Sequence, residues 1–193
     1  LIGLDAENVV KIAPGGEAVN VNGTLSTGRN VARGKTAVGS VNYSTRTGAN
    51  VTNGTKNYEN ANDWLTTHGN RVGASVVIDL GSDHNIDRAV IYNQNEYGGT
   101  AEGASSKREV KGFRLQGSSD NSNWTTVLDS EMGRSDGHEP NPGWSFRIPA
   151  NWVDDDEGTN YRYWKFIMDT FHGDDPYGGI TEIELYEASD VLE

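Results

Sequence analysis

The chain has 193 residues, no cysteine and 34% hydrophobic residues, and its 28 acidic against 16 basic residues give a net charge of -12. A chain of this length can bury a core as one domain without disulfide staples, and the absence of cysteine excludes thiol catalysis and thiolate metal sites. The acidic balance, with no basic run, excludes the usual nucleic-acid surface, and no apolar stretch is long enough to cross a bilayer.

Short apolar segments broken by Gly, Asn and Asp, with almost no helical period, predict an all-β protein. Residues 1–28 contain two weak strands around residues 14–16 and are expected to form an N-terminal extension or linker, or an added hairpin. Alternation of apolar and polar residues in the later strands is typical of a sheet with one buried face. These strands are expected at residues 76–80, 88–92, 113–116, 144–148, 163–168 and 183–186.

The boundaries of the domain are predicted at residues 29 and 188, followed by a tail of residues 189–193. The tail ends in Leu-Glu, a pair typical of a cloning scar, and the chain begins without Met. We therefore expect a domain excised from a larger protein.

Enzyme motifs give no usable catalytic site. Residues 133–137 match Gly-x-Ser-x-Gly, but the segment that follows contains two prolines and cannot start the helix that a nucleophile elbow needs. The four histidines show no metal-binding spacing, and the acidic run 154–157 lacks the alternating ligands of an EF-hand loop. The sequence names no nucleophile, base and orienting residue, so we expect no enzyme activity in this domain.

Several separated stretches occur in an order that resembles one family, the discoidin or coagulation-factor five/eight type C domain, which includes carbohydrate-binding module family 32. Each stretch is weak alone, and their order and spacing make the resemblance specific. It covers about residues 30 to 188. The stretches are residues 30–37, 51–54, 62–64, 77–92, 113–124, 161–166 and 179–186.

The resemblance implies an eight-stranded jelly-roll β-sandwich of the galactose-binding type, which agrees with the strand pattern. It also places Trp64 and Trp124 at packing positions, so both are expected in the core.

Members of this family usually hold one structural calcium ion, and the matching positions imply side-chain or main-chain oxygen ligands here. Two positions depart from the family, because Asn53 stands in place of Asp and Asn62 in place of Thr. Glu59, in a short insertion, could supply the lost carboxylate. The implied calcium ligands are Asn53, Asn62, Glu182, Val51, Thr181 and Glu59.

Ligands in this family bind to loops at one end of the sandwich, where a sugar would need a flat apolar face and planar hydrogen-bonding groups. Residues 93–97, at the start of the glycine-rich loop 93–107, and the loop 171–177 have this chemistry, and two residues after Trp64 add to it. The predicted ligand-binding residues are Asn93, Asn95, Glu96, Tyr97, His172, Asp174, Asp175, Tyr177, His68 and Arg71.

The resemblance implies a non-catalytic carbohydrate-binding module that targets a larger extracellular protein, such as a polysaccharide-degrading enzyme in the same parent chain, to a polysaccharide or oligosaccharide. The strong negative charge favours a neutral sugar over a polyanion. We expect a monomer from a secreted or cell-surface protein, of bacterial origin, with no nucleic-acid or membrane partner. The alternative is a cell-surface adhesion module that uses the same loops to bind a protein.

Overall fold

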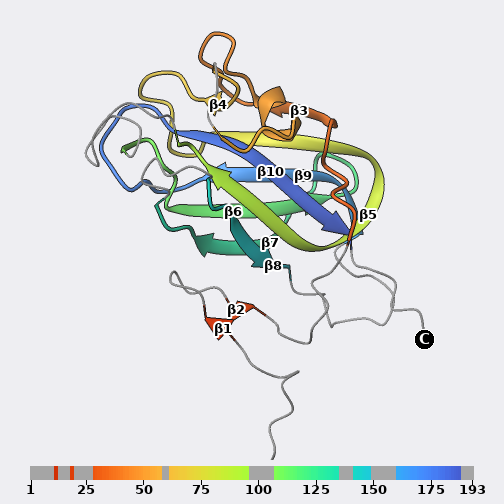
Figure 1. The fold of residues 1–193 in the computed structure, drawn as a ribbon. Coiled ribbons are helices and arrows are strands. Elements are labelled where there is room, and N and C mark those ends of the chain that lie inside the picture. The colour runs from red at the N-terminus through yellow and green to blue at the C-terminus, as the bar shows by residue number, and fades with distance from the viewer. Residues whose placement is uncertain are drawn as a thin grey trace, which may run out of the picture.

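The computed structural model describes residues 11–12, 18–19, 28–57, 61–95, 107–134, 141–148 and 160–187, most of which form a β-sandwich (Figure 1). No helix among these residues is long and apolar enough to span a bilayer. In chain order the elements are β1 (Lys11–Ile12), β2 (Ala18–Val19), β3 (Thr36–Gly39), the 3-10 helix η2 (Gly48–Thr52), β4 (Trp64–Leu65), β5 (Ser75–Asn93), β6 (Gly112–Ser118), β7 (Thr125–Glu131), β8 (Trp144–Arg147), β9 (Asn160–Met168) and β10 (Gly179–Glu187).

The long strand β5 belongs to both layers of the sandwich, as its curved path in Figure 1 shows. Its first half pairs with β3 and β9, and its second half pairs with β10 and β8, all antiparallel. Between the halves, Gly81 has a φ of 88° and the register with β9 shifts between Asp79 and His84. A positive φ is cheap for glycine, so the chain can bend here without ending the strand. The two strands predicted at 76–80 and 88–92 are therefore one.

The two layers follow from these pairings. One layer has the order β4-β10-β5-β8, and the other has the order β3-β5-β9-β6-β7. The predicted strands at 113–116, 163–168 and 183–186 lie within β6, β9 and β10, and the one predicted at 144–148 ends one residue earlier, as β8. The predicted all-β class and eight-stranded sandwich are thus confirmed.

Alternating side chains of β5, β6, β9 and β10 fill the core between the layers. Its largest fully buried side chains include Trp64, Trp164, Phe113 and Phe166, and the last two rings stack with their centroids 5.2 Å apart. The expectation that Trp124 lies in the core is wrong. Its ring is only partly buried, and the Lys165 ammonium lies 3.6 Å from the ring centre.

The N-terminal segment contains one described pairing, in which β1 and β2 run antiparallel with Lys11 opposite Val19. The other residues of 1–27, and the tail from residue 188, lie outside the described residues. The predicted division into an extension, a domain and a tail stays a prediction.

Candidate functional site

An aromatic cluster lies where β10 begins beside β4. The Tyr177 ring meets Tyr43 edge-on at a centroid distance of 5.4 Å and His68 at 5.6 Å. Tyr177 is half-buried, His68 is exposed, and Tyr43 is 45% exposed. We call Tyr43, His68 and Tyr177 the loop-end cluster. It gives this end of the sandwich aromatic surface that solvent can reach.

Hydrogen bonds to its own residues and to the segment 66–69 hold the loop of Tyr177 in place. The Tyr177 amide donates to the Asp175 carboxylate at 2.9 Å, which makes a tight turn around Pro176. The Pro176 carbonyl accepts from Gly69, and the Thr66 hydroxyl accepts from the Gly178 amide at 3.0 Å. The loop is thus fastened to the segment that carries His68 before β10 begins.

A buried ion pair supports the segment on which Tyr43 lies. The Arg46 guanidinium binds both carboxylate oxygens of Asp63, one of them at 2.6 Å, and the Asp63 side chain is fully buried. The Tyr43 amide donates to the carbonyl of Leu65 in β4. These contacts tie the turn at 43–46 to β4.

Charged side chains border the loop-end cluster. The Arg108 guanidinium lies over the Tyr177 ring at 5.3 Å and pairs with Asp175 at 3.3 Å. Lys107 pairs with Asp174 at 3.3 Å, and this contact lowers the pKa of the exposed Asp174 carboxyl.

Arg71 completes this border. Its guanidinium lies 4.4 Å from the ring centre of Phe171 and donates to the Gly173 carbonyl at 2.9 Å. Rings with an apolar face, surrounded by planar hydrogen-bonding groups, suit a small polar ligand that itself has an apolar face.

The structure brings together five of the ten residues predicted to bind the ligand. They are His68, Arg71, Asp174, Asp175 and Tyr177. Glu96 and Tyr97 lie outside the described residues.

Burial removes Asn93 and Asn95 from the surface that a ligand could reach, whereas the role predicted for His172 stays a prediction. Asn93 ends β5 fully buried, and its side-chain amide donates to the Val110 carbonyl at 2.8 Å and accepts from the Val110 amide at 2.9 Å. Asn95 is also fully buried. The His172 ring is bonded to the Met132 carbonyl at 2.9 Å. The buried Asn93 therefore serves the fold, because its amide satisfies the backbone of Val110.

Sequence reasoning missed Tyr43, Lys107 and Arg108. Tyr43 and Arg108 lie far along the chain from Tyr177, and they reach it only through the pairing of β4 with β10 and the parallel bridge between Glu109 and Gly179. No local pattern marks them.

A second candidate site surrounds the buried carboxylate of Glu182 on β10. Its Oε1 accepts from the Gly54 amide at 2.9 Å, and its Oε2 is buried with no hydrogen-bond partner among the described residues. Asn53 donates to the Asn62 carbonyl at 3.3 Å, which brings two of the predicted calcium ligands together. Burying a carboxylate oxygen without a partner costs folding free energy, and a cation bound to this oxygen would offset the cost.

The oxygen donors of this candidate metal centre fit calcium in kind. The predicted ligands among the described residues are one carboxylate, two side-chain amides and the main-chain oxygens of Val51 and Thr181, and all of these are the hard oxygen ligands that calcium prefers. No group of three acidic or histidine ligands occurs among the described residues, and Glu59 lies outside them. The site would therefore depend on amide and carbonyl oxygens more than a usual calcium site does.

Burial raises the pKa of Glu182 to about 8, although the Gly54 amide opposes this rise. The nearby charges of Arg33 and Lys56 also oppose it, whereas the charge of Glu184 reinforces it. Lys56 pairs with Glu184 at 3.0 Å.

Asn141 joins this region to β5. Its side-chain amide donates to the carbonyls of Lys56 at 3.0 Å and Asn93 at 2.8 Å. Asn141 is not one of the predicted calcium ligands. The loop 53–57 is thus held to the sandwich by side chains besides the candidate ligands.

Comparisons with known proteins agree with this fold. Residues 50–141 match the F5/F8 type C family model described as NedA-like, galactose-binding domain. No curated protein matches the sequence.

Solved structures match the chain over most of its length. A family 32 module of Clostridium perfringens, CpGH89CBM32-5, in complex with GalNAc-beta-1,3-galactose, has a TM-score of 0.59 at 12% identity and covers 79% of this chain and 95% of its own. The family 32 module of C. perfringens NanJ, in complex with galactose, has a TM-score of 0.59 at 14% identity, over 83% and 98% of the two chains. A chitosan-binding module of a Paenibacillus sp. IK-5 chitosanase/glucanase has a TM-score of 0.58 at 21% identity, over 82% and 98%.

At these identities the structural likeness concerns the fold, and the family model adds a match in sequence over the middle of the chain. The chain therefore has the galactose-binding-like β-sandwich of carbohydrate-binding modules and lectin domains, and its resemblance to the discoidin or factor five/eight type C family is confirmed.

Proposed function

We propose that this chain is a non-catalytic carbohydrate-binding module that binds a neutral sugar through the loop-end cluster. The observation that carries the proposal is the exposed aromatic surface of Tyr43, His68 and Tyr177, bordered by arginine and carboxylate groups. An aromatic face packs against the C–H groups of a pyranose, while the bordering groups bind its hydroxyls. Structural neighbours that are complexed with galactose and GalNAc-beta-1,3-galactose support this class of ligand.

Charge favours a neutral ligand. Two acidic residues at this end, Asp174 and Asp175, are each paired with a basic side chain, and the whole chain carries a net charge of -12. A polyanion would meet long-range repulsion from the domain. It would also compete with Asp174 for Lys107 and with Asp175 for Arg108.

The proposal includes a structural calcium ion at Glu182. The unpartnered Oε2 supports it, as does the bond from the Gly54 amide to Oε1, which brings the residue after Asn53 to the Glu182 carboxylate. When bound, calcium would neutralise the carboxylate and fasten the loop that contains Asn53 to β10.

In a larger protein the module would hold its parent against a glycan. Tethering raises the effective concentration of an attached catalytic domain at the polysaccharide, so a weak sugar contact can suffice. The proposal extends to a secreted or cell-surface parent protein of bacterial origin, which the bacterial modules among the structural neighbours support.

Affinity electrophoresis through gels that contain neutral polysaccharides tests the proposal. The wild type should be retarded by at least one of them, Tyr177→Ala should migrate as in a gel without polysaccharide, and Tyr177→Phe should keep most of the retardation because it keeps the ring. Arg71→Ala should weaken retardation, whereas Arg29→Ala should not.

Arg29 is a matched control because it is exposed and pairs with Glu187 at the opposite end of β10. A glycan array with neutral and acidic sugars gives the ligand class. If no sugar is bound and a surface protein is captured through the same loop-end residues, the domain is an adhesion module and the sugar proposal fails.

A further inference from the structure

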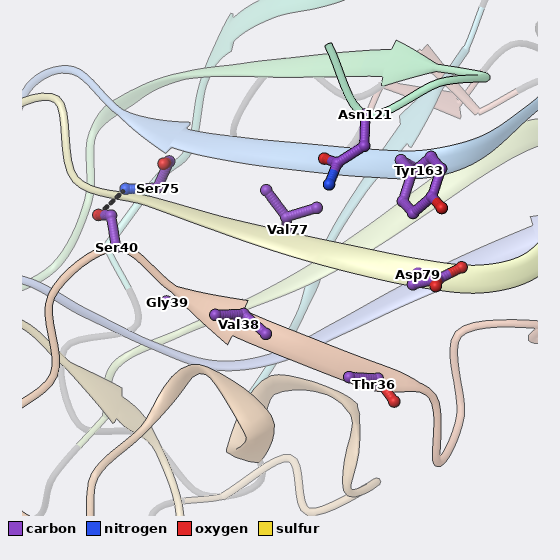
Figure 2. A pocket seen from close by; sticks show the side chains of 9 residues that line it. All are labelled: Thr36, Val38, Gly39, Ser40, Ser75, Val77, Asp79, Asn121 and Tyr163. Atoms are coloured by element: carbon purple, nitrogen blue, oxygen red, sulfur yellow. Dashed lines mark hydrogen bonds between the residues drawn. The ribbon is translucent and has the colours of Figure 1, made fainter.

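A groove on the face of one β-layer has no residue of the loop-end cluster in its lining. Its volume is about 440 Å³, within the range of roughly 300 to 1,000 Å³ that is typical of small-molecule sites. Figure 2 shows side chains of β3, β5 and β9 around it, on the outer side of the layer. Antiparallel register aligns Val38 with Val77, and Thr36 with Asp79 and Tyr163. The groove is thus built on rigid strands.

The groove contains apolar surface that the fold does not use. Val38 is 64% exposed, and Val77 and Tyr163 are partly exposed, whereas the alternate residues of the same strands point into the core. Two valines on the solvent side of neighbouring strands make a small apolar surface next to the aromatic ring of Tyr163. A ligand with one flat apolar face would fit against it.

Polar groups lie along the same groove. The hydroxyl of Thr36 lies on the β3 side, and the amide of Asn121 reaches in from the turn between β6 and β7 (Figure 2). Asn121 has a φ of 59°, a conformation that Asn tolerates better than most residues. The Asp120 carboxylate holds this turn by accepting from the amides of Ser122 at 2.8 Å and Asn123 at 2.7 Å. Asn121 is therefore presented on a fixed turn.

The charges at the groove are balanced. Asp79 is the one ionisable carboxylate that lines it, and Arg162 binds its two oxygens at 2.7 and 2.9 Å. The nearby Lys35 ammonium is engaged by the Leu80 carbonyl at 2.6 Å. The lining thus offers hydroxyl, amide and paired carboxylate groups, which favours a neutral ligand that has many hydroxyls.

We propose that this groove is a second carbohydrate subsite, which takes one neutral hexopyranose ring. The C–H face of the sugar packs on Val38, Val77 and Tyr163, and its hydroxyls bond to Thr36, Asp79 and Asn121. This subsite lies on the strands, so it does not need the loop-end cluster. With two sites on one small domain, a polysaccharide could be bound at two points, which strengthens attachment.

The test uses protein in which the loop-end site is removed by Tyr177→Ala, so that the two proposals can fail separately. The 15N-labelled protein is titrated with D-galactose, D-glucose, D-mannose or N-acetyl-D-galactosamine, and amide shifts are followed by NMR. With at least one sugar, the amides of Val38, Val77, Asp79 and Asn121 should show saturable shifts. Adding Tyr163→Ala should weaken that binding about tenfold, the order expected when one aromatic contact is lost.

Two exposed valines provide a matched pair of further variants. Val38→Asp should abolish the shifts in the groove, whereas Val72→Asp should leave them unchanged, since Val72 is 70% exposed and does not line the groove. D-galacturonate should bind more weakly than D-galactose, because the lining carries no unpaired positive charge.

The proposal is overturned if none of the sugars shifts the groove amides, or if the shifts persist unchanged in both Tyr163→Ala and Val38→Asp. Preferred binding of D-galacturonate would overturn the assignment of a neutral ligand.

Discussion

Without metal, the domain should become less stable as the pH rises, because of the buried carboxyl group of Glu182. Below about pH 4.5 this group is protonated in both the folded and the unfolded chain and adds no pH dependence. Between pH 4.5 and about 8 the unfolded chain releases the proton while the folded chain keeps it. Unfolding is therefore favoured progressively over this range, and the loss levels off above it.

The size of the loss follows from the two pKa values. The pKa of Glu182 is 4.5 in the unfolded chain and about 8 in the fold. At roughly 1.4 kcal/mol per pKa unit, this difference lowers the free energy of unfolding by about 5 kcal/mol. A typical domain has a total stability of only about 5 to 15 kcal/mol, so the effect should be large. Calcium bound to the carboxylate would take the place of the proton. Its stabilising effect should therefore grow from acid to alkaline pH.

Urea unfolding, followed by tryptophan fluorescence near pH 5 and pH 8.5, measures this effect in a chelator and in calcium. The wild type in chelator should be less stable at the higher pH, and calcium should restore it. Glu182→Gln should show little pH dependence and no response to calcium, because the amide can still accept from Gly54 but has no charge. If the metal-free wild type is equally stable at both pH values, or Glu182→Gln loses stability as the wild type does, the reasoning about this group is wrong.

Three further predictions concern groups that hold the candidate sites in place. Arg46→Ala should destabilise the domain by about 3 to 5 kcal/mol in urea unfolding, because it leaves Asp63 buried without its partner. Similar unfolding midpoints for the variant and the wild type would refute this. Asn93→Ala should lower the free energy of unfolding by about 2 to 4 kcal/mol in thermal or urea unfolding, since it removes the hydrogen bonds to the buried backbone of Val110. A stable variant with weakened sugar binding would instead make Asn93 a ligand residue. Gly54→Ala should cost on the order of 1 to 2 kcal/mol and reduce the calcium response, because φ is 84° there, a conformation that strains a residue with a Cβ. An unchanged response in calorimetry would count against this prediction.

The strands could be predicted because alternation is a local property. The apolar positions of β6 and β9 follow the two-residue period of a half-buried strand, and the structure places them in the core. The continuity of β5 could not be read in the same way. Its centre, from Gly81 to Asn85, is polar and mostly exposed, which in a sequence is typical of a turn between two strands.

The candidate site was predictable where polar loops of the matching family pattern mark the residues, as in the loop 171–177 and at His68 and Arg71 after Trp64. Asp174, Asp175 and Tyr177 are neighbours in sequence, whereas Tyr43 joins them through strand pairing. Asn93 shows the opposite failure, because a polar residue after an apolar strand is typical of an exposed loop. Here its amide satisfies the backbone of a residue 17 positions away, a role that only the folded chain reveals.

The central claim is that a neutral sugar binds at the loop-end cluster, and isothermal titration calorimetry with a sugar found on the glycan array tests it most directly. The wild type in calcium should bind it, Tyr177→Ala should bind at least about tenfold more weakly with an unchanged melting temperature, and Tyr177→Phe should stay close to the wild type. Equal affinity in the wild type and Tyr177→Ala, with both proteins folded, would contradict the account and move the binding face away from this end of the sandwich.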